Sequence, residues 1–177
     1  MAPSSVPGLP HYHGRQYYSE INLELSYKVV DAVLDLVQTS GHVGSYTIAP
    51  INEAVGSNDL RTLGTDAALS QKAADWLLKY ILGTIERVAA ANPNILIMLQ
   101  GSFRGEAFLA PKLPLSANLV IDTHIYYFAG RACDSDSVPL ILEDVKHAQG
   151  SHTFPVMIGE WSIETEFNNR RDSRKQI

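Results

Sequence analysis

The stretch Tyr46-Thr47-Ile48-Ala49-Pro50-Ile51-Asn52-Glu53-Ala54 is a short apolar run that ends in an amide and a carboxylate. A buried strand that carries polar side chains at its C-terminal tip is the usual way in which an α/β barrel presents catalytic groups. A second stretch, from Phe154 to Ser162, has the same form and places Glu160 after its apolar residues. Two glutamates at strand ends predict a pair of carboxylates at one edge of a sheet.

Two long segments have the apolar spacing of amphipathic helices. Ser19 is a suitable N-cap for the first helix, which we expect to end at Ser40-Gly41, and Ser70 for the second, which we expect to end before Asn92-Pro93. A weaker helical pattern covers residues 137–148. The predicted buried face of the first helix is Ile21, Leu25, Val29, Val33 and Val37, with Val30 and Leu34 beside it; that of the second is Ala73, Leu77, Ile81, Ile85 (or Thr84) and Val88.

Four short apolar runs are predicted strands: Tyr46–Ile51, Ile95–Leu99, Leu119–Ile121 and Val156–Ile158. Because helical patterns separate most of them, the sequence predicts right-handed β-α-β units and a parallel sheet. Polar residues follow each strand, so only one edge of the sheet carries chemistry. This α/β pattern fits either a barrel or an open doubly wound sheet. Neither glycine-rich phosphate-binding motif occurs, which argues against a nucleotide site.

The composition limits the possible partners. At 177 residues and 45% hydrophobic, the chain is expected to form one domain, with a loop over residues 1–18 and a solvated polar tail over 168–177. A net charge of −5 without a basic stripe argues against nucleic acid and anionic membrane, and no apolar run is long enough to cross a bilayer. The N-terminus lacks the pattern of a signal peptide. Cys133 is the single cysteine, so it cannot form an internal disulfide.

His11 and His13 are the first candidates for a metal site. On a strand they would share a face, but no cysteine or carboxylate lies between them. We therefore expect them to be loop or substrate-cleft histidines, and we predict no metal.

The two glutamates suggest glycoside hydrolysis. In that reaction one carboxyl group protonates the leaving oxygen while the other attacks the anomeric carbon or activates water. Candidate hydrogen-bond donors to Glu160 are His124 and Tyr126, since residues two apart on a strand share a face. Asn52 is placed to bond a sugar hydroxyl, and the aromatic candidates for stacking on a sugar ring are Trp161, Phe103 and Phe128.

The alternative interpretation needs no active site. A glutamate after a strand is often an exposed loop residue, His124 is then a hydrogen-bonded core histidine, and the aromatic residues are packing. From pattern alone, an α/β domain of unspecified function, for example one that binds a small molecule, stays open.

Three ordered motifs add a resemblance. Ile51-Asn-Glu53, the segment Ile121–Tyr126 and the segment Ile158–Ser162 resemble the signatures of glycoside hydrolase family 5, specifically the fungal exo-β-1,3-glucanase group. Within that group, Thr47–Ala54, Met98–Gln100 and the doubled Tyr126-Tyr127 are most similar to the endo-β-1,6-glucanase branch. The resemblance covers about residue 4 to residue 168, and Val6-Pro-Gly8 is similar to the loop after the third barrel strand.

The resemblance implies a retaining β-glucan hydrolase. Glu53 would be the general acid/base and Glu160 the nucleophile, and Asn52 would bind the 2-hydroxyl of the reacting glucose. His124 and Tyr126 would orient the nucleophile's surroundings. The resemblance implies that the substrate is a β-1,3- or β-1,6-glucan of the fungal cell wall and that the protein is extracellular or located in the cell wall. It implies no metal and no organic cofactor. Oligomeric state stays open.

Two departures from the resemblance affect these expectations. Ala54 stands where most of the wider family has proline after the acid/base, which we interpret as a feature of the branch. The second departure is larger: a complete barrel has eight strands and about 250 residues, whereas this chain supplies the equivalents of strands four to seven. We therefore expect a partial TIM (β/α)8 barrel. The alternative function is a catalytically inactive truncated fragment with at most weak glucan binding.

Overall fold

The structure is a computed structural model that describes residues 17–56, 62, 65–127, 137–148 and 152–162. Of the sequence predictions, those for His11, His13, Val6-Pro-Gly8, Phe128 and the polar tail lie outside these residues. The elements in chain order are α2 (Glu20–Thr39), η1 (Val43–Ser45), β1 (Thr47–Ile48), η3 (Asp66–Ala68), α3 (Gln71–Ala91), β2 (Leu96–Gln100), α4 (Gly105–Leu109), η4 (Ala110–Lys112), β3 (Leu119–Tyr126), α5 (Ser137–Ala148) and β4 (Val156–Ser162). The three η elements are 3-10 helices.

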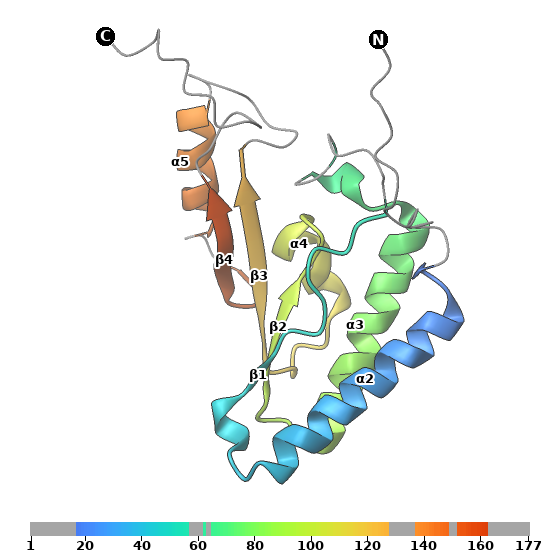
Figure 1. Ribbon diagram of the computed structural model, residues 1–177. Helices are drawn as coiled ribbons and strands as arrows, with labels where there is room; N and C mark the ends of the chain where they lie inside the picture. The colour runs from blue at the N-terminus through green and yellow to red at the C-terminus, as the bar shows by residue number, and fades with distance from the viewer. Residues whose placement is uncertain (1–16, 57–61, 63–64, 128–136, 149–151, 163–177) are drawn as a thin grey trace, which may run out of the picture.

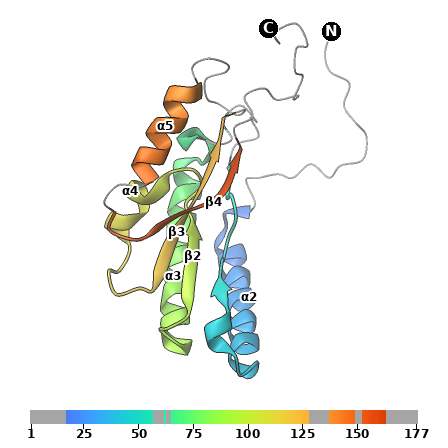
Figure 2. The same ribbon diagram turned by 90° about the vertical axis from the view of Figure 1, so that its left-hand side faces the viewer.

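The four strands form one parallel sheet in the order β1-β2-β3-β4, which confirms the predicted α/β class. Figures 1 and 2 show α3, α4 and α5 on one side of the sheet and α2 beyond its β1 edge. The strand order follows the chain order, as in successive β-α units of a barrel. None of the helices in the described ranges is long and apolar enough to cross a bilayer.

Helix α3 forms as the sequence predicts. The Ser70 side chain caps its N-terminus by accepting a hydrogen bond from the Ala73 N–H, at 3.3 Å. The predicted apolar face is buried, and Leu77 and Ile81 at its centre are 1% and 0% exposed. This face packs in one hydrophobic core with the strands and α2, so α3 is the helix that anchors the sheet.

The predicted buried face of α2 is wrong in part. Ile21, Leu25, Val29 and Val33 are exposed, at 74%, 52%, 63% and 39%. The adjacent face packs into the core instead, and it consists of Leu23, Tyr27, Val30, Leu34 and Val37. Both faces are apolar, and contact with α3 decides which of them is buried. The spacing of apolar residues in α2 contains no information about these contacts, so it could not predict which face is buried.

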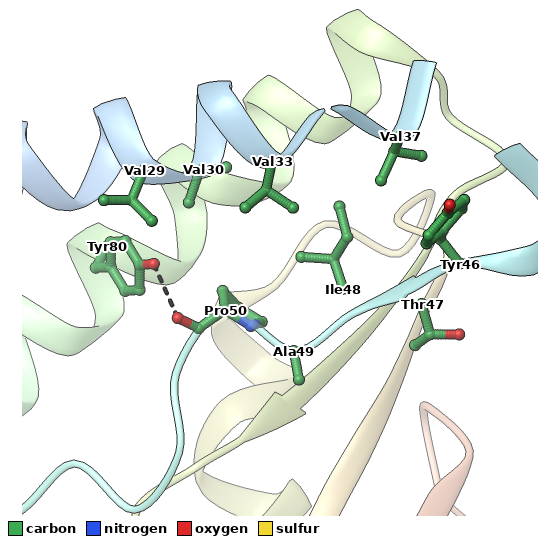
Figure 3. Close-up of a pocket in the computed structure, with 10 residues that line it drawn as sticks. All are labelled: Val29, Val30, Val33, Val37, Tyr46, Thr47, Ile48, Ala49, Pro50 and Tyr80. Carbon is green, nitrogen blue, oxygen red and sulfur yellow. Dashed lines mark hydrogen bonds between the residues drawn. The ribbon is translucent and has the colours of Figure 1, made fainter. Parts of the chain in front are cut away.

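The exposed side of α2 borders an apolar groove along the β1 edge of the sheet. In Figure 3, valines of α2 face Ile48, Ala49 and Pro50, and the Tyr80 hydroxyl donates a 3.0 Å hydrogen bond to the Pro50 carbonyl. The complete lining is Val29, Val30, Val33, Val37, Tyr46, Thr47, Ile48, Ala49, Pro50 and Tyr80. Among the described residues, the groove lies between α2 and the edge of β1 that no other strand pairs with.

The strand bounds differ from the predicted ones where the motifs lie. β1 pairs only through Thr47 and Ile48, since Pro50 has no N–H for a sheet ladder. β3 and β4 extend beyond their apolar runs to Tyr126 and Ser162, so the polar motif residues belong to the strands. A short helix, α4, lies between β2 and β3, in a segment for which the sequence predicted no element.

Candidate active site

One side of β3 carries three of the polar groups at the site. Asp122, His124 and Tyr126 are two residues apart, and alternate side chains of a strand point to the same face. His124 is 6% exposed and Asp122 is 7% exposed. The strand therefore presents a row of two buried groups and a tyrosine that runs toward its C-terminal end.

A β-bulge aligns the neighbouring strand with this row. Thr123 pairs with Ile158, but His124 pairs with Glu160, so Gly159 is an extra residue in β4. The insertion shifts the alternation of β4 by one residue beyond this point. It brings Glu160 level with His124 at the same edge of the sheet.

Glu53 reaches the site from the segment after β1. Its backbone has φ of 42°, a left-handed conformation that is uncommon for a residue with a Cβ. The Glu53 N–H donates to Gln100 Oε1 at 3.1 Å, and the Ser102 N–H donates to the same oxygen at 2.9 Å. Gln100 is 2% exposed, and Ser102 also has positive φ, of 53°. One buried amide thus holds two strained turns together.

The structure brings Glu53 and Glu160 together around His124. The His124 Nδ1 atom lies 2.8 Å from Glu53 Oε1 and 3.5 Å from Glu160 Oε2. One oxygen of each glutamate and a ring nitrogen of His124 all lie within 4.8 Å of one another. The Tyr126 hydroxyl donates to Glu160 Oε2 at 2.7 Å. His124 was expected to serve Glu160, but its short hydrogen bond is to Glu53.

Two groups at this site have raised pKa values. Burial of His124 lowers its pKa, but hydrogen bonds with Glu53 and Asp122 and the charges of Asp122 and Glu160 outweigh burial, so the pKa lies above the ordinary value of 6.5. The hydrogen bond with Glu160, together with burial, raises the pKa of Tyr126 to about 12. The tyrosine therefore remains a neutral donor at physiological pH, and the surroundings of His124 stabilise its protonated form relative to that of a free histidine.

The remaining predicted site residues are not all at this cluster. Asn52 is exposed and adjoins Glu53 in the chain. Phe103 is partly exposed in the tight turn after β2, with φ of 65°. Trp161 is 67% exposed, and strand alternation places it on the opposite face of the sheet from Glu160. The structure therefore brings together the two glutamates, His124 and Tyr126, and it leaves Trp161 apart.

Sequence reasoning did not assign a role to Gln100 or Asp122. Asp122 lies two residues before His124, so strand alternation alone could have placed it on the same face. Gln100 ends an apolar strand, which marked it as polar but left its partners unknown. Its contacts come from segments 47 and 2 residues away in the chain.

The grouping of Glu53, His124 and Glu160 also has the size of a cation site. That spacing does not identify metal ligands, because the three side chains already engage one another and Tyr126, and acidic groups often cluster without an ion. Two carboxylates at this spacing suffice for acid/base and nucleophilic chemistry.

Comparison with solved structures finds two proteins similar to this chain in fold and in sequence. The chain is 45% identical to AoRut, with a TM-score of 0.75 over 84% of this chain and 41% of AoRut. It is 40% identical to rutinosidase from Aspergillus niger, with a TM-score of 0.76 over 85% of this chain and 43% of the rutinosidase. No protein-family model matches the chain, and no curated protein sequence matches it.

The chain spans about two fifths of the length of the solved structures it matches. At 40–45% identity, the chain and the two solved structures are similar in sequence as well as in fold. The four strands with their helices correspond to part of these longer proteins. The comparisons confirm the predicted partial barrel, but they do not identify the glucanase group that the motifs resemble. The chain has the fold of part of a glycosidase.

Proposed function

We propose that the chain carries the catalytic carboxylates of a retaining glycosidase, with Glu53 as general acid/base and Glu160 as nucleophile. The observation that supports this most directly is the separation of the two carboxylates, one oxygen of each lying within 4.8 Å of the other. Retaining enzymes hold these groups about 5–5.5 Å apart, whereas inverting enzymes leave about 6.5–9.5 Å for a water molecule. The short separation favours direct attack by a carboxylate.

The reaction proceeds in two displacements. Glu160 attacks the anomeric carbon while Glu53 donates its proton to the leaving oxygen, which breaks the glycosidic bond and forms a glycosyl ester on Glu160. Glu53, now ionised, accepts a proton from water as the water oxygen attacks the anomeric carbon and displaces Glu160. The product keeps the configuration of the substrate.

The neighbouring groups support each carboxylate in its role. The Tyr126 hydroxyl donates to Glu160 and stabilises the charged form that a nucleophile requires. The His124 Nδ1 atom faces Glu53 Oε1 at 2.8 Å, and a proton on Nδ1 stabilises the negative charge that develops when Glu53 gives up its proton. Asn52, exposed next to Glu53, is available to bond a hydroxyl of the reacting sugar.

Two substrate classes have specific support. The similarity to rutinosidase from Aspergillus niger favours a rutinoside as substrate. The motifs around Glu53, His124 and Glu160 resemble those of β-1,3- and β-1,6-glucanases, which favours a cell-wall β-glucan and an extracellular site of action. Both are O-glycosides that the same pair of carboxylates can cleave.

Hydrolysis assays separate catalysis from mere binding. We expect wild-type chain to release sugar from a chromogenic rutinoside, from laminarin or from pustulan, and both Glu160→Gln and Glu53→Gln to abolish the release. Glu24→Gln, a change at an exposed glutamate of α2, is the matched control and should retain activity. Proton NMR of the first product should show the anomeric configuration of the substrate. Initial inversion, or undiminished activity in Glu160→Gln, would contradict the proposal.

The second candidate is an inactive fragment that binds glycan weakly. It is favoured by the share of the related enzymes that the chain spans, 41–43%, and by the apolar groove at β1, which none of the described residues fills. No hydrolysis by wild type on any of the three substrates, combined with binding that survives Glu160→Gln, would support this candidate and reject catalysis.

A further inference from the structure

Asp122 is a buried carboxylate that the catalytic steps above do not use. It is 7% exposed, and its Oδ2 atom lies 3.2 Å from His124 Nε2, on the opposite side of the imidazole ring from Glu53. Its other oxygen, Oδ1, is buried without a hydrogen-bond partner among the described residues. Burying a carboxylate away from water is unfavourable unless a partner compensates for the lost hydration. The compensating partner here is His124.

Gly159 makes the room that Asp122 occupies. A Cβ atom at position 159 would lie 2.1 Å from Asp122 Oδ1, 2.8 Å from its Cγ and 2.9 Å from its Oδ2. Any side chain at 159 would therefore displace the carboxylate. Gly159 is also the extra residue of the bulge that aligns Glu160 with His124. One residue thus determines the register of the nucleophile and the position of Asp122.

The hydrogen-bonding requirements of the ring indicate its charge. Among the described residues, the titratable groups that face His124 are Glu53 from the segment after β1, Asp122 from β3 and Glu160 from β4. Neutral imidazole has one N–H, so when Glu53 and Asp122 are both ionised, one of these two flanking carboxylates would face a lone pair. Imidazolium has an N–H for each side. The raised pKa of His124 agrees with this geometry.

We propose that Asp122 is a positioning residue that holds His124 as an imidazolium with Nδ1 directed at the two catalytic glutamates, and that Gly159 is required for this placement. The proposal rests on the function proposed for Glu53 and Glu160. Asp122 touches no reacting atom and acts through His124. With the ring charged and fixed, an N–H remains directed at Glu53 when it loses its proton and lies near Glu160 when that group is released from the sugar.

The test uses two substitutions with matched controls. Asp122→Asn removes the charge and keeps the shape, and Gly159→Ala displaces the carboxylate without changing it. Asp35→Asn changes an exposed aspartate of α2, and Gly44→Ala adds a Cβ that meets no atom within 4 Å. The first readout is the NMR titration of the His124 ring. We expect both test variants to lower the His124 titration midpoint relative to wild type and both controls to leave it unchanged.

Kinetics give the second readout. In both test variants we expect kcat to fall about 10- to 100-fold with little change in KM, as for loss of a hydrogen bond to a charged group worth roughly 1.5–3 kcal/mol. The alkaline limb of kcat/KM should move to lower pH. A His124 midpoint that is unchanged in Asp122→Asn overturns the proposal. If wild type shows no hydrolysis but both variants lower the midpoint, the placement of His124 by Asp122 is supported and the glycosidase function is rejected.

Discussion

The backbone of Glu53 is held in a conformation that its own side chain disfavours. A left-handed φ costs a non-glycine residue about 1 kcal/mol or more, and such strain persists only where the surroundings compensate for it. The compensation is the Gln100 side-chain oxygen Oε1, which accepts hydrogen bonds from the N–H groups of both Glu53 and Ser102. The position of the proposed acid/base therefore depends on a residue of the next strand.

Replacement of Gln100 by methionine tests this dependence. Gln100→Met keeps the side-chain length but leaves two N–H groups without an acceptor, at a cost of about 1–3 kcal/mol each in the free energy of unfolding. Activity should fall in parallel because Glu53 loses its anchor. Gln100→Glu retains an acceptor oxygen and should be closer to wild type in urea denaturation, as should Gln71→Met on the exposed surface of α3. Equal stability of Gln100→Met and wild type would refute the argument.

His124 makes stability depend on pH in a defined direction. Its pKa is raised in the folded state above the ordinary 6.5, so the protonated ring stabilises the fold fully below pH 6.5 and the stabilisation is lost as pH rises through the folded pKa. We expect the difference in free energy of unfolding between wild type and His124→Gln to shrink as pH increases from about 6, where the carboxylates are ionised. Denaturation series across this range measure it. A difference that grows with pH would show that His124 is held neutral.

At the scale of the element, α2 shows how two adjacent valines differ. Val30 is 4% exposed in the core, whereas Val29 is 63% exposed beside the groove. Val30→Ala should cost about 1–3 kcal/mol, since buried methyl groups are removed and a cavity remains. Val29→Ala should change stability by about 0.5 kcal/mol or less. Urea denaturation of both variants gives the comparison, and each serves as the other's control because the chemical change is identical.

The strands also show which features the apolar pattern predicts and which depend on neighbouring strands. Leu119–Ile121 and Val156–Ile158 are apolar enough to be recognised as strands, but β3 and β4 continue through polar residues to Tyr126 and Ser162. Hydrogen bonding to a neighbouring strand carries the pairing beyond the apolar run. A bulge at Gly159 then sets which side chains share a face, and nothing in the apolar pattern marks such an insertion.

At the scale of the whole molecule, the part of the chain that the structure describes leaves apolar surface exposed. The exposed residues of α2 adjoin the groove at β1, and β1 has no partner strand on that side among the described residues. Unpaired edges and contiguous apolar patches favour association and lower the stability of an isolated domain. We therefore expect the purified chain to unfold in a broad transition at low temperature. A single cooperative melt in the mesophile range, about 45–65 °C, would contradict this expectation.

The sequence by itself determined the parallel α/β architecture and the position of two glutamates at one edge of the sheet. Apolar strand runs and helix spacing are local signals, and carboxyl ends of parallel strands meet at one edge, so Glu53 and Glu160 could be paired before any coordinates. The caps at Ser19 and Ser70 were equally local and are confirmed.

Only the tertiary structure decided the rest. Which face of α2 is buried, how Gln100 joins two turns, and that His124 lies between Asp122 and Glu53 all depend on contacts between segments far apart in the chain. A sequence pattern records the preferences of each segment separately. The charge and direction of a buried histidine come instead from the groups that packing places around it, over a few ångströms of poorly solvated space.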